Sequence, residues 1–487
     1  MSDNKNDRPL ELILAGMPDD VRITRHEIHE HTVELFVEWD EPKRGERICP
    51  ECGSARCVKK DSGAMQTVRH TRSGMLGTLV TFHKPRYLCR ECGGTFYMRP
   101  SWVLDGISIT TGLFLEIVTE LTATTHCVSQ IAKETNSSPA IVRNVMRHID
   151  LGKPARLPET IGMDEFHGNT GTYNKESKRF DTEKYHCVIT DPDGGFVLDI
   201  LYKATFRELH DYFMEYHLVL RQKVKFICAD MRSGFSKAAR ACFPNARICI
   251  DPFHVIKLIT EAISSVRIDI WRGIAAEASK ASSLAALLKD NGDIEGSEKK
   301  ASEAALLMDN AKLVKNSQKI LVTSPFNATA YWNKNPKRRD ERLGEIYAAA
   351  PDLKLAKEAL EDFYYTAAKP AFEIRRSALS DWLDKYLSCE LPAIRRAAES
   401  IKKHRKGIED AWKFSKSNGT TEGLNKKIKD CRRMAFGAHD FESFRKRALL
   451  ACGNTTVIRS TYTIFGEKRS PGTDGPDGND EGTGKGA

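Results

Sequence analysis

The chain has 487 residues, of which 40% are apolar, and it carries a formal net charge of +9 at pH 7. That length suffices for about three domains of ordinary size, and the apolar fraction suffices to bury a core in each. No run reaches the roughly 18 to 20 apolar residues of a membrane helix, and the polar start MSDNKNDRPL is unlike a secretory signal. We therefore expect a cytoplasmic, multidomain globular protein without a membrane partner.

The N-terminal part is expected to form a β-rich zinc-binding module over residues 1–103. Residues 21–40 alternate apolar and polar side chains, which is typical of a two-stranded ribbon. Two C-x-x-C pairs follow, with 36 residues between them. Each pair can form a tight turn whose thiolates occupy two corners of a zinc tetrahedron. The predicted ligands of a structural Zn²⁺ are Cys49, Cys52, Cys89 and Cys92.

Two other interpretations of these cysteines stay open. They would be unliganded core thiols, or a redox pair, although no thioredoxin-like strand and helix pattern surrounds either C-x-x-C. Cys57 lies near the first pair and is left outside the ligand set. Because a module of this size cannot easily fold on its own apolar core, a bound metal would supply part of its folding free energy.

Residues 104–157 are predicted to be a helix-turn-helix module that binds DNA. Residues 128–149 contain two apolar helical faces around the polar turn ETNSS, and Ser138 followed by Pro139 starts the second helix. This second helix presents side chains that reach phosphates or base edges in a major groove. They are Arg143, Asn144 and Arg147. The alternative is a pair of short packed helices without a role in DNA binding.

Residues 158–256 have the pattern of a mixed sheet. Short apolar runs separated by polar turns and amphipathic segments predict three strands, a helix, a strand, a helix and a strand. That is the element order of a ribonuclease-H-like fold, in which acidic residues lie at neighbouring strand ends. We take this segment as the first part of a catalytic core.

The rest of the chain is predicted to be helical. Residues 257–412 form an all-α insertion, and residues 413–465 complete the core with a helix that carries Glu422. Residues 466–487 are poor in apolar side chains and rich in Gly, Asp and Pro, so they are expected to be disordered. The fold class is therefore multidomain α+β, with a zinc ribbon, a helix-turn-helix and a ribonuclease-H-like α/β core interrupted by the insertion.

Three carboxylates in this core suggest phosphodiester chemistry. Asp164 and Asp230 end apolar runs that predict buried strands, and Glu422 opens a lysine-rich helix. Two divalent ions about 4 Å apart activate the attacking oxygen and stabilise the leaving oxygen of a phosphodiester. Mg²⁺ or Mn²⁺ suits such hard oxygen ligands. Glu165 competes with Asp164 as a ligand, because alternation along a strand does not decide which of the two faces the site.

Asp251 and His254 form a second polar pair at a strand end. Either they lie near the scissile phosphate, in the second shell behind the metal ligands, or Asp251 caps a helix and His254 is a histidine whose hydrogen bonds are made within the fold. Nearby, residues 394–433 hold thirteen Lys and Arg against five Asp and Glu, which favours a polyanionic partner over a merely solvated lysine face. The candidate DNA contacts beside Glu422 are Lys426, Lys427, Lys429, Arg432 and Arg433.

Several motifs together resemble a known family. From about residue 45 to 452 the chain contains CPEC, CREC, the helix-turn-helix, GMDEF, ADM, IDPFHVIK and SNGTTEGLNKKIKDCRRMAFGAHDFESFRKRALL. This arrangement is similar to the ISL3 family of bacterial insertion-sequence transposases. Its last segment is the most specific, and Pro252 in IDPFHV stands where the resemblance leads us to expect arginine.

The resemblance implies a DDE transposase whose metal-binding triad is Asp164, Asp230 and Glu422. It implies that the N-terminal modules bind the terminal inverted repeats in double-stranded DNA. Such enzymes expose 3′ hydroxyls at the transposon ends and join them to target DNA by transesterification, as homodimers or larger assemblies. The alternatives are a zinc and helix-turn-helix regulator with an inert core, and a metal-dependent structure-selective nuclease; metal-dependent strand joining separates the first reading from both.

Overall fold

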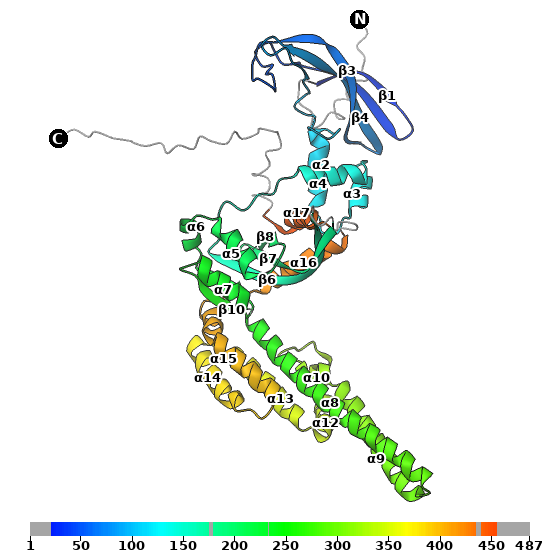
Figure 1. Cartoon of the computed structure of the whole chain (residues 1–487), viewed down its shortest axis with the longest axis vertical. Coiled ribbons are helices and arrows are strands. Elements are labelled where there is room, and N and C mark those ends of the chain that lie inside the picture. The colour runs from blue at the N-terminus through cyan, green and yellow to red at the C-terminus, as the bar shows by residue number, and fades with distance from the viewer. Residues whose placement is uncertain (1–20, 175–178, 232, 435–439, 455–487) are drawn as a thin grey trace, which may run out of the picture. The chain divides into compact units, whose positions relative to one another are not determined.

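The computed structural model describes residues 21–174, 179–231, 233–434 and 440–454 (Figure 1). The tail predicted to be disordered, residues 466–487, lies outside them. The chain divides into two compact units, one of residues 1–152 with 430–487 and one of residues 153–429. Among the described helices, none has both the length and the apolar character needed to cross a bilayer.

The first unit begins with a five-stranded sheet. Its strand order is β1-β2-β4-β3, with β5 paired to β4. Alternate residues of β2 are buried, among them Val33, Leu35 and Val37, and they pack in one core with Phe82 and Trp102. The alternation predicted for residues 21–40 thus forms an antiparallel ribbon with one buried face. The strands are β1 (Val21–Ile28), β2 (Thr32–Trp39), β3 (Cys57–Ser73), β4 (Leu76–Cys89) and β5 (Thr95–Tyr97).

Helices complete this unit: α2 (Thr111–Leu121), α3 (Val128–Glu134), α4 (Pro139–His148) and α17 (Phe441–Cys452). The Ser138 side chain accepts a 3.3 Å hydrogen bond from the Ile141 amide, as expected of the predicted cap. The sequence predicts that α17 belongs to the core segment 413–465, whereas the structure packs it on α2 and α4. The buried Arg447 side chain explains this position, because it donates to the carbonyls of Ala123 and His126 at 2.6 and 2.7 Å.

The second unit contains a mixed sheet of order β10-β9-β6-β7-β8. β6, β7 and β8 are antiparallel neighbours, while β9 and β10 run parallel to β6. Helices α5 and α7 cover one face, where Met163, Ile189, Phe213 and Ala238 share a core. The elements are β6 (Thr160–Asn174), β7 (Arg179–Asp191), β8 (Phe196–Leu201), α5 (Phe206–Met214), α6 (Leu218–Gln222), β9 (Phe226–Ala229), α7 (Ser233–Cys242) and β10 (Arg247–Ile250).

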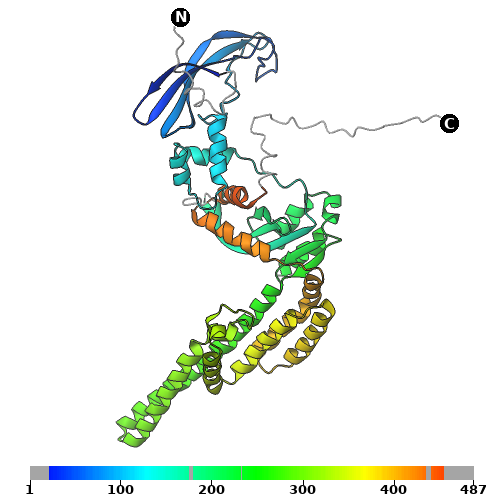
Figure 2. The ribbon, with the colours of Figure 1, turned by 180° about the vertical axis from the view of Figure 1, so that it is seen from behind.

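Helices α8 to α15 follow β10 and share one large core that includes Phe363, Trp382 and Trp412. α8 and α9 form a long helical hairpin, and α16 then returns to the sheet, where it lies as an orange helix against the strands in Figure 2. The bounds are α8 (Pro252–Asp290), α9 (Ile294–Lys315), α10 (Gln318–Val322), α11 (Tyr331–Lys334), α12 (Pro336–Ala349), α13 (Asp352–Ala367), α14 (Phe372–Leu387), α15 (Pro392–Lys413) and α16 (Gly419–Met434).

Candidate active site and zinc centre

Three aspartates lie side by side on the neighbouring strands β6, β9 and β10. The prediction that Asp164 ends its strand is wrong, because β6 continues to Asn174, whereas Asp230 and Asp251 directly follow the last residues of β9 and β10. Met163 pairs with Ala229, and Ala229 pairs with Ile250, in two parallel ladders. The next residue on each strand is an aspartate: Asp164, Asp230 and Asp251. Residues in register on parallel strands share a face, and neighbouring strands are about 4.8 Å apart. The sheet register therefore brings together two predicted ligands that are far apart in sequence.

Helix α16 is anchored to this strand edge by buried polar contacts. The hydroxyls of Thr190 and Thr421 lie 2.7 Å apart, and the Asn418 side chain donates to the Met163 carbonyl at 3.4 Å. Gly162 makes this close approach possible, since a Cβ on it would lie 2.3 Å from both threonine hydroxyl oxygens. The start of α16 is thus held against β6 and β7, which places Glu422 beside the aspartates.

Asn425 contacts Asp164 directly. Its side-chain nitrogen donates a 2.7 Å hydrogen bond to Asp164 Oδ2, while Asp164 Oδ1 accepts from the Glu165 amide at 2.8 Å. Asn425 is 5% exposed, and its Oδ1 is buried without a hydrogen-bond partner in the described part of the chain. Asp164 therefore faces α16. Glu165 pairs with Cys187, and strand alternation directs it to the opposite face.

Glu422 lies in the first turn of α16, where the helix dipole favours a negative charge. Its Oε1 is 3.7 Å from His254 Nε2. Burial raises the pKa of Glu422 above its ordinary value; His254 opposes this, and the charges of Asp251 and Asp164 add to it. Burial likewise raises the pKa of Asp164, against the influence of His254 and Asn425. A cation between these groups would favour their ionised forms.

The acidic residues suit hard divalent cations. Carboxylate and amide oxygens are the ligands that Mg²⁺ accepts, and the buried Asn425 Oδ1 adds an unused one beside Asp164. In the described structure, the oxygens of Asp164, Asp230 and Glu422 do not form a group with all members within 4.8 Å of one another.

Asp251 is engaged in structural contacts. Its Oδ1 accepts from the Phe253 amide at 2.7 Å, which caps α8, and its Oδ2 accepts from the Ser417 hydroxyl at 2.8 Å and from the Asn418 amide. Asp251 therefore joins the start of α8 to the segment before α16. His254, one turn into α8, has a buried Nε2 without a hydrogen-bond partner among the described residues.

The four predicted zinc ligands form a cluster in the first unit. The sulfurs of Cys49 and Cys92 are 3.7 Å apart, and those of Cys52 and Cys89 are 3.6 Å apart. A zinc tetrahedron with Zn–S bonds of about 2.3 Å has edges of about 3.8 Å, so the spacing fits the metal. The fifth thiol, Cys57, instead donates to the Ser54 carbonyl at 3.4 Å.

Backbone amides prepare the cysteine turns for metal. A glycine with positive φ follows each C-x-x-C, Gly53 at +71° and Gly93 at +73°, and its amide donates to the carbonyl of the first cysteine. The Cys92 amide lowers the pKa of the Cys89 thiol to about 6. In the same turn the Gly94 amide lowers the pKa of Cys92, but the Cys49 thiol, burial and the other thiols outweigh it and raise that pKa to about 12. A thiolate is the form that binds zinc, so a bound zinc would have to displace the proton of Cys92.

The predicted DNA contacts lie on two helices. On α4, Arg143 and Arg147 are exposed, and Asn144 accepts a 2.9 Å hydrogen bond from Arg147. On α16, the exposed cations are Lys426, Lys427, Lys429 and Arg433, of which Arg433 pairs with Asp430 at 3.1 Å. Arg432 is partly exposed.

Sequence reasoning missed the glycine and the polar side chains that fix α16 to the sheet. They are Gly162, Thr190, Asn418, Thr421 and Asn425. One signal was available, because Asn425 follows Glu422 by three positions and residues three apart share a helix face. The other contacts depend on the sheet register and have no local pattern.

Two family models and several known transposases match this chain. Residues 161–448 match the ISL3 family model described as "Transposase", and residues 46–92 match "zinc-finger of transposase IS204/IS1001/IS1096/IS1165". The second match confirms the predicted zinc ribbon. The transposase for insertion sequence element IS1001 of Bordetella parapertussis is 23% identical over 84% of this chain and 92% of that protein. The transposase for IS1557 of Mycobacterium tuberculosis is 25% identical over 91% of this chain and 96% of that protein.

Proposed function

Because the chain belongs to the ISL3 family of transposases, we propose that it moves an insertion sequence by cutting and joining DNA. It would bind the terminal inverted repeats, cleave the transposon ends and join the 3′ hydroxyls to target DNA. The observation that carries this proposal is the parallel register that sets Asp164 beside Asp230, with α16 bringing Glu422 to the same edge.

The catalytic core would be ribonuclease-H-like. The order of three antiparallel strands, helices, a parallel strand, a helix and a second parallel strand supports this assignment, as does the all-α segment between β10 and α16. Asp164 and Asp230, on the neighbouring strands β6 and β9, would hold the metal ions that bind the reacting phosphate. The helix pair α3 and α4 would be the helix-turn-helix.

Asp164, Asp230 and Glu422 would hold two Mg²⁺ or Mn²⁺ ions. When bound, such ions polarise the phosphodiester and increase the acidity of the attacking water or hydroxyl. The protein's own contribution is to keep the ligands in place: Asn425 holds Asp164 by its 2.7 Å hydrogen bond, and Asp251 fixes the turn that leads into α16. His254 lies where it can orient Glu422.

DNA binding would be divided among several surfaces. The zinc ribbon, together with Arg143, Asn144 and Arg147, would recognise the inverted repeats. The cations of α16 lie on the helix of Glu422, so they would contact phosphates near the cleavage point. Two ends must be paired during transposition, and we therefore expect a homodimer or a larger assembly on DNA.

An excision and integration assay in bacteria tests the proposal. A marker flanked by the DNA that borders this gene is supplied with the wild-type protein or with Asp230→Asn. Mobilisation by the wild type alone supports a DDE transposase. Retained end binding without mobilisation by either protein would instead indicate a regulator with an inert core, and metal-dependent cleavage without joining would indicate a nuclease.

A further inference from the structure

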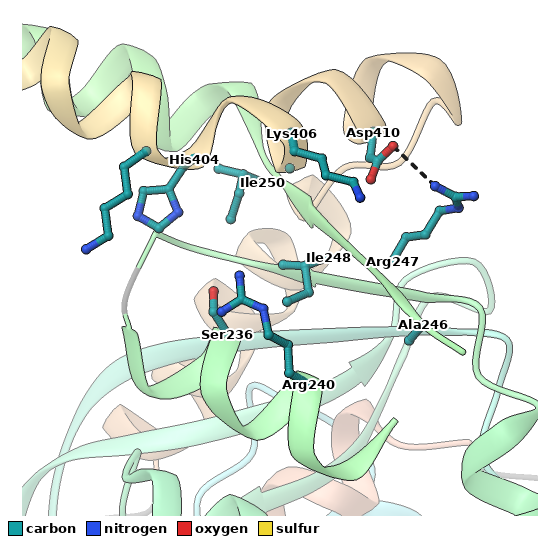
Figure 3. Close-up of a pocket in the computed structure, with 11 residues that line it drawn as sticks. Ser236, Arg240, Ala246, Arg247, Ile248, Ile250, His404, Lys406 and Asp410 are labelled. Atoms are coloured by element: carbon teal, nitrogen blue, oxygen red, sulfur yellow. Dashed lines mark ion pairs between the residues drawn. The ribbon is translucent and has the colours of Figure 1, made fainter. Parts of the chain in front are cut away.

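A basic cavity of about 230 Å³ lies in the second unit, between α7, β10 and α15 (Figure 3). Figure 3 shows Arg240 rising from α7, while His404 and Lys406 extend from α15 on the other side of β10. Its volume is somewhat below the roughly 300 to 1,000 Å³ of pockets that hold small molecules. It is large enough for a phosphate group.

The charges that line the cavity are mostly uncompensated. Four cationic side chains and one carboxylate line it. The carboxylate, Asp410, is 3.8 Å from Arg247, which also lies over the Phe414 ring. Arg240, Lys403 and Lys406 have no ion pair or side-chain hydrogen bond with any described residue. Cations from two separate helices therefore converge on one space, which creates a local positive potential.

The cavity combines an exposed basic rim with a buried floor, because the side chains of Arg240, Lys403 and Lys406 are exposed. Its floor is apolar, since Ile250 is 1% exposed and Ile248 is partly buried. Helix α15 lies so close to β10 that a Cβ on Gly407 would be 2.7 Å from Ile250 Cγ1. Burial, together with the charges of Lys403 and Arg240, lowers the pKa of His404. The imidazole thus experiences the positive field that an anion would neutralise.

We infer that this cavity is a phosphate-binding site, which takes either a phosphodiester of DNA or the phosphate of a free nucleotide. Arg240, Lys403 and Lys406 would hold the phosphate oxygens by charge-assisted hydrogen bonds. Ile250 precedes Asp251, so the cavity lies at the same strand end as the candidate active site, and strand alternation directs it to the other face. If the bound phosphate belongs to DNA, the inference rests on the proposed function. If it belongs to a free nucleotide, the inference is independent of that function.

The first arm of the test measures duplex binding by the full-length protein over a range of KCl concentrations. The variants are Arg240→Gln and Lys406→Gln. The control is Lys402→Gln, an exposed lysine of α15 that lies outside the cavity lining. If the phosphate belongs to DNA, each cavity variant lowers the slope of log Kobs against log salt by about 1 relative to the control.

The second arm measures melting temperature in inorganic phosphate against chloride at equal ionic strength. Phosphate that binds only the folded protein raises the melting temperature of the wild type and of Lys402→Gln, and the cavity variants lose that rise. Loss of the rise with an unchanged salt slope assigns the site to a free phosphate or nucleotide. If both cavity variants match Lys402→Gln in both arms, the inference is wrong. Failure of the wild type to bind any duplex would contradict the proposed function. The melting temperatures in phosphate would still show whether the cavity binds phosphate.

Discussion

Asn425 donates a 2.7 Å hydrogen bond to Asp164 across a sequence separation of 261 residues. One is on α16 and the other is on β6, so this bond links the helix of Glu422 to the strand that carries the first aspartate. The all-α segment separates the two residues in sequence. Their direct contact nevertheless holds the helix of Glu422 against the strand of Asp164.

Replacing Asn425 by leucine should destabilise the protein. A hydrogen bond to a charged group contributes about 1.5 to 3 kcal/mol, and its loss leaves Asp164 with one fewer partner at a partly buried position. Asn425→Asp should lower the melting temperature more strongly in EDTA, because it adds a carboxylate beside Asp164, and MgCl₂ should restore much of that loss. Thermal melting with and without MgCl₂ checks both, with Lys426→Leu as the exposed control on the same helix. Equal melting of Asn425→Leu and the control would show that the bond contributes nothing.

Gly162→Ala should displace α16 and reduce strand cleavage by at least about tenfold, since small misplacements of catalytic groups are costly. The added methyl group would lie 2.3 Å from the hydroxyl oxygens of Thr190 and Thr421. Gly423→Ala is the matched control, because a Cβ there meets open space and alanine favours a helix by up to about 1 kcal/mol. Cleavage of a labelled transposon end and melting temperature are the measurements. Wild-type cleavage by Gly162→Ala would mean that the close approach of α16 is dispensable.

Asp164→Asn and Asp230→Asn should each abolish cleavage and strand transfer while leaving binding to the inverted repeats intact. Each change removes a negative charge where the metal ligands are proposed and keeps the side-chain volume. Gel-shift binding and cleavage of the same labelled DNA separate the two properties. Loss of binding or of folding in these variants would make the aspartates structural.

Cys49→Ser should remove about one equivalent of zinc per chain and weaken binding to the inverted repeats. A structural zinc contributes folding free energy, so the ribbon should also become sensitive to proteases. Cys57→Ser is the control: its thiol donates to the Ser54 carbonyl, and it should keep its zinc. Elemental analysis measures the zinc content of both variants. An unchanged zinc content in Cys49→Ser would show that Cys49 is not a zinc ligand.

The sequence predicted those parts of the site that have a local pattern. The apolar runs predict the strands β6 and β9, although β6 continues past Asp164 to Asn174, and the C-x-x-C spacing predicts the zinc ribbon. The sequence does not determine whether Asp164 or Glu165 faces the site, because a shift of one residue exchanges the two faces of a strand. Helix α16 contacts the face of Gly162 and Asp164, which supports the proposal of Asp164 as the ligand.

Two other features also depend on packing between distant segments. Helix α17 has the amphipathic pattern of many helices, and its position follows from the buried bonds of Arg447 to two carbonyls of the α2–α3 turn. The cations of the basic cavity come from α7, β10 and α15, and in sequence they are ordinary surface lysines and arginines. Neither arrangement has a short-range signal.

The pKa values of Asp164 and Glu422, both raised by burial, predict how stability and magnesium binding depend on pH. A raised carboxyl pKa means that the folded state binds protons more tightly than the unfolded chain. Without metal, stability should therefore fall as pH rises from the ordinary carboxyl pKa of about 4 through the raised values. Magnesium competes with these protons, so its stabilising effect should be small near pH 5 and larger near pH 7.

Melting temperatures with EDTA or MgCl₂ over this pH range test the prediction. Glu422→Gln should reduce both the fall in stability and the gain from magnesium, because it removes one of the two titrating groups. Glu399→Gln, at an exposed position of α15, should behave as the wild type does. A magnesium effect that is independent of pH, or equal in the two variants, would show that the cation binds away from Glu422.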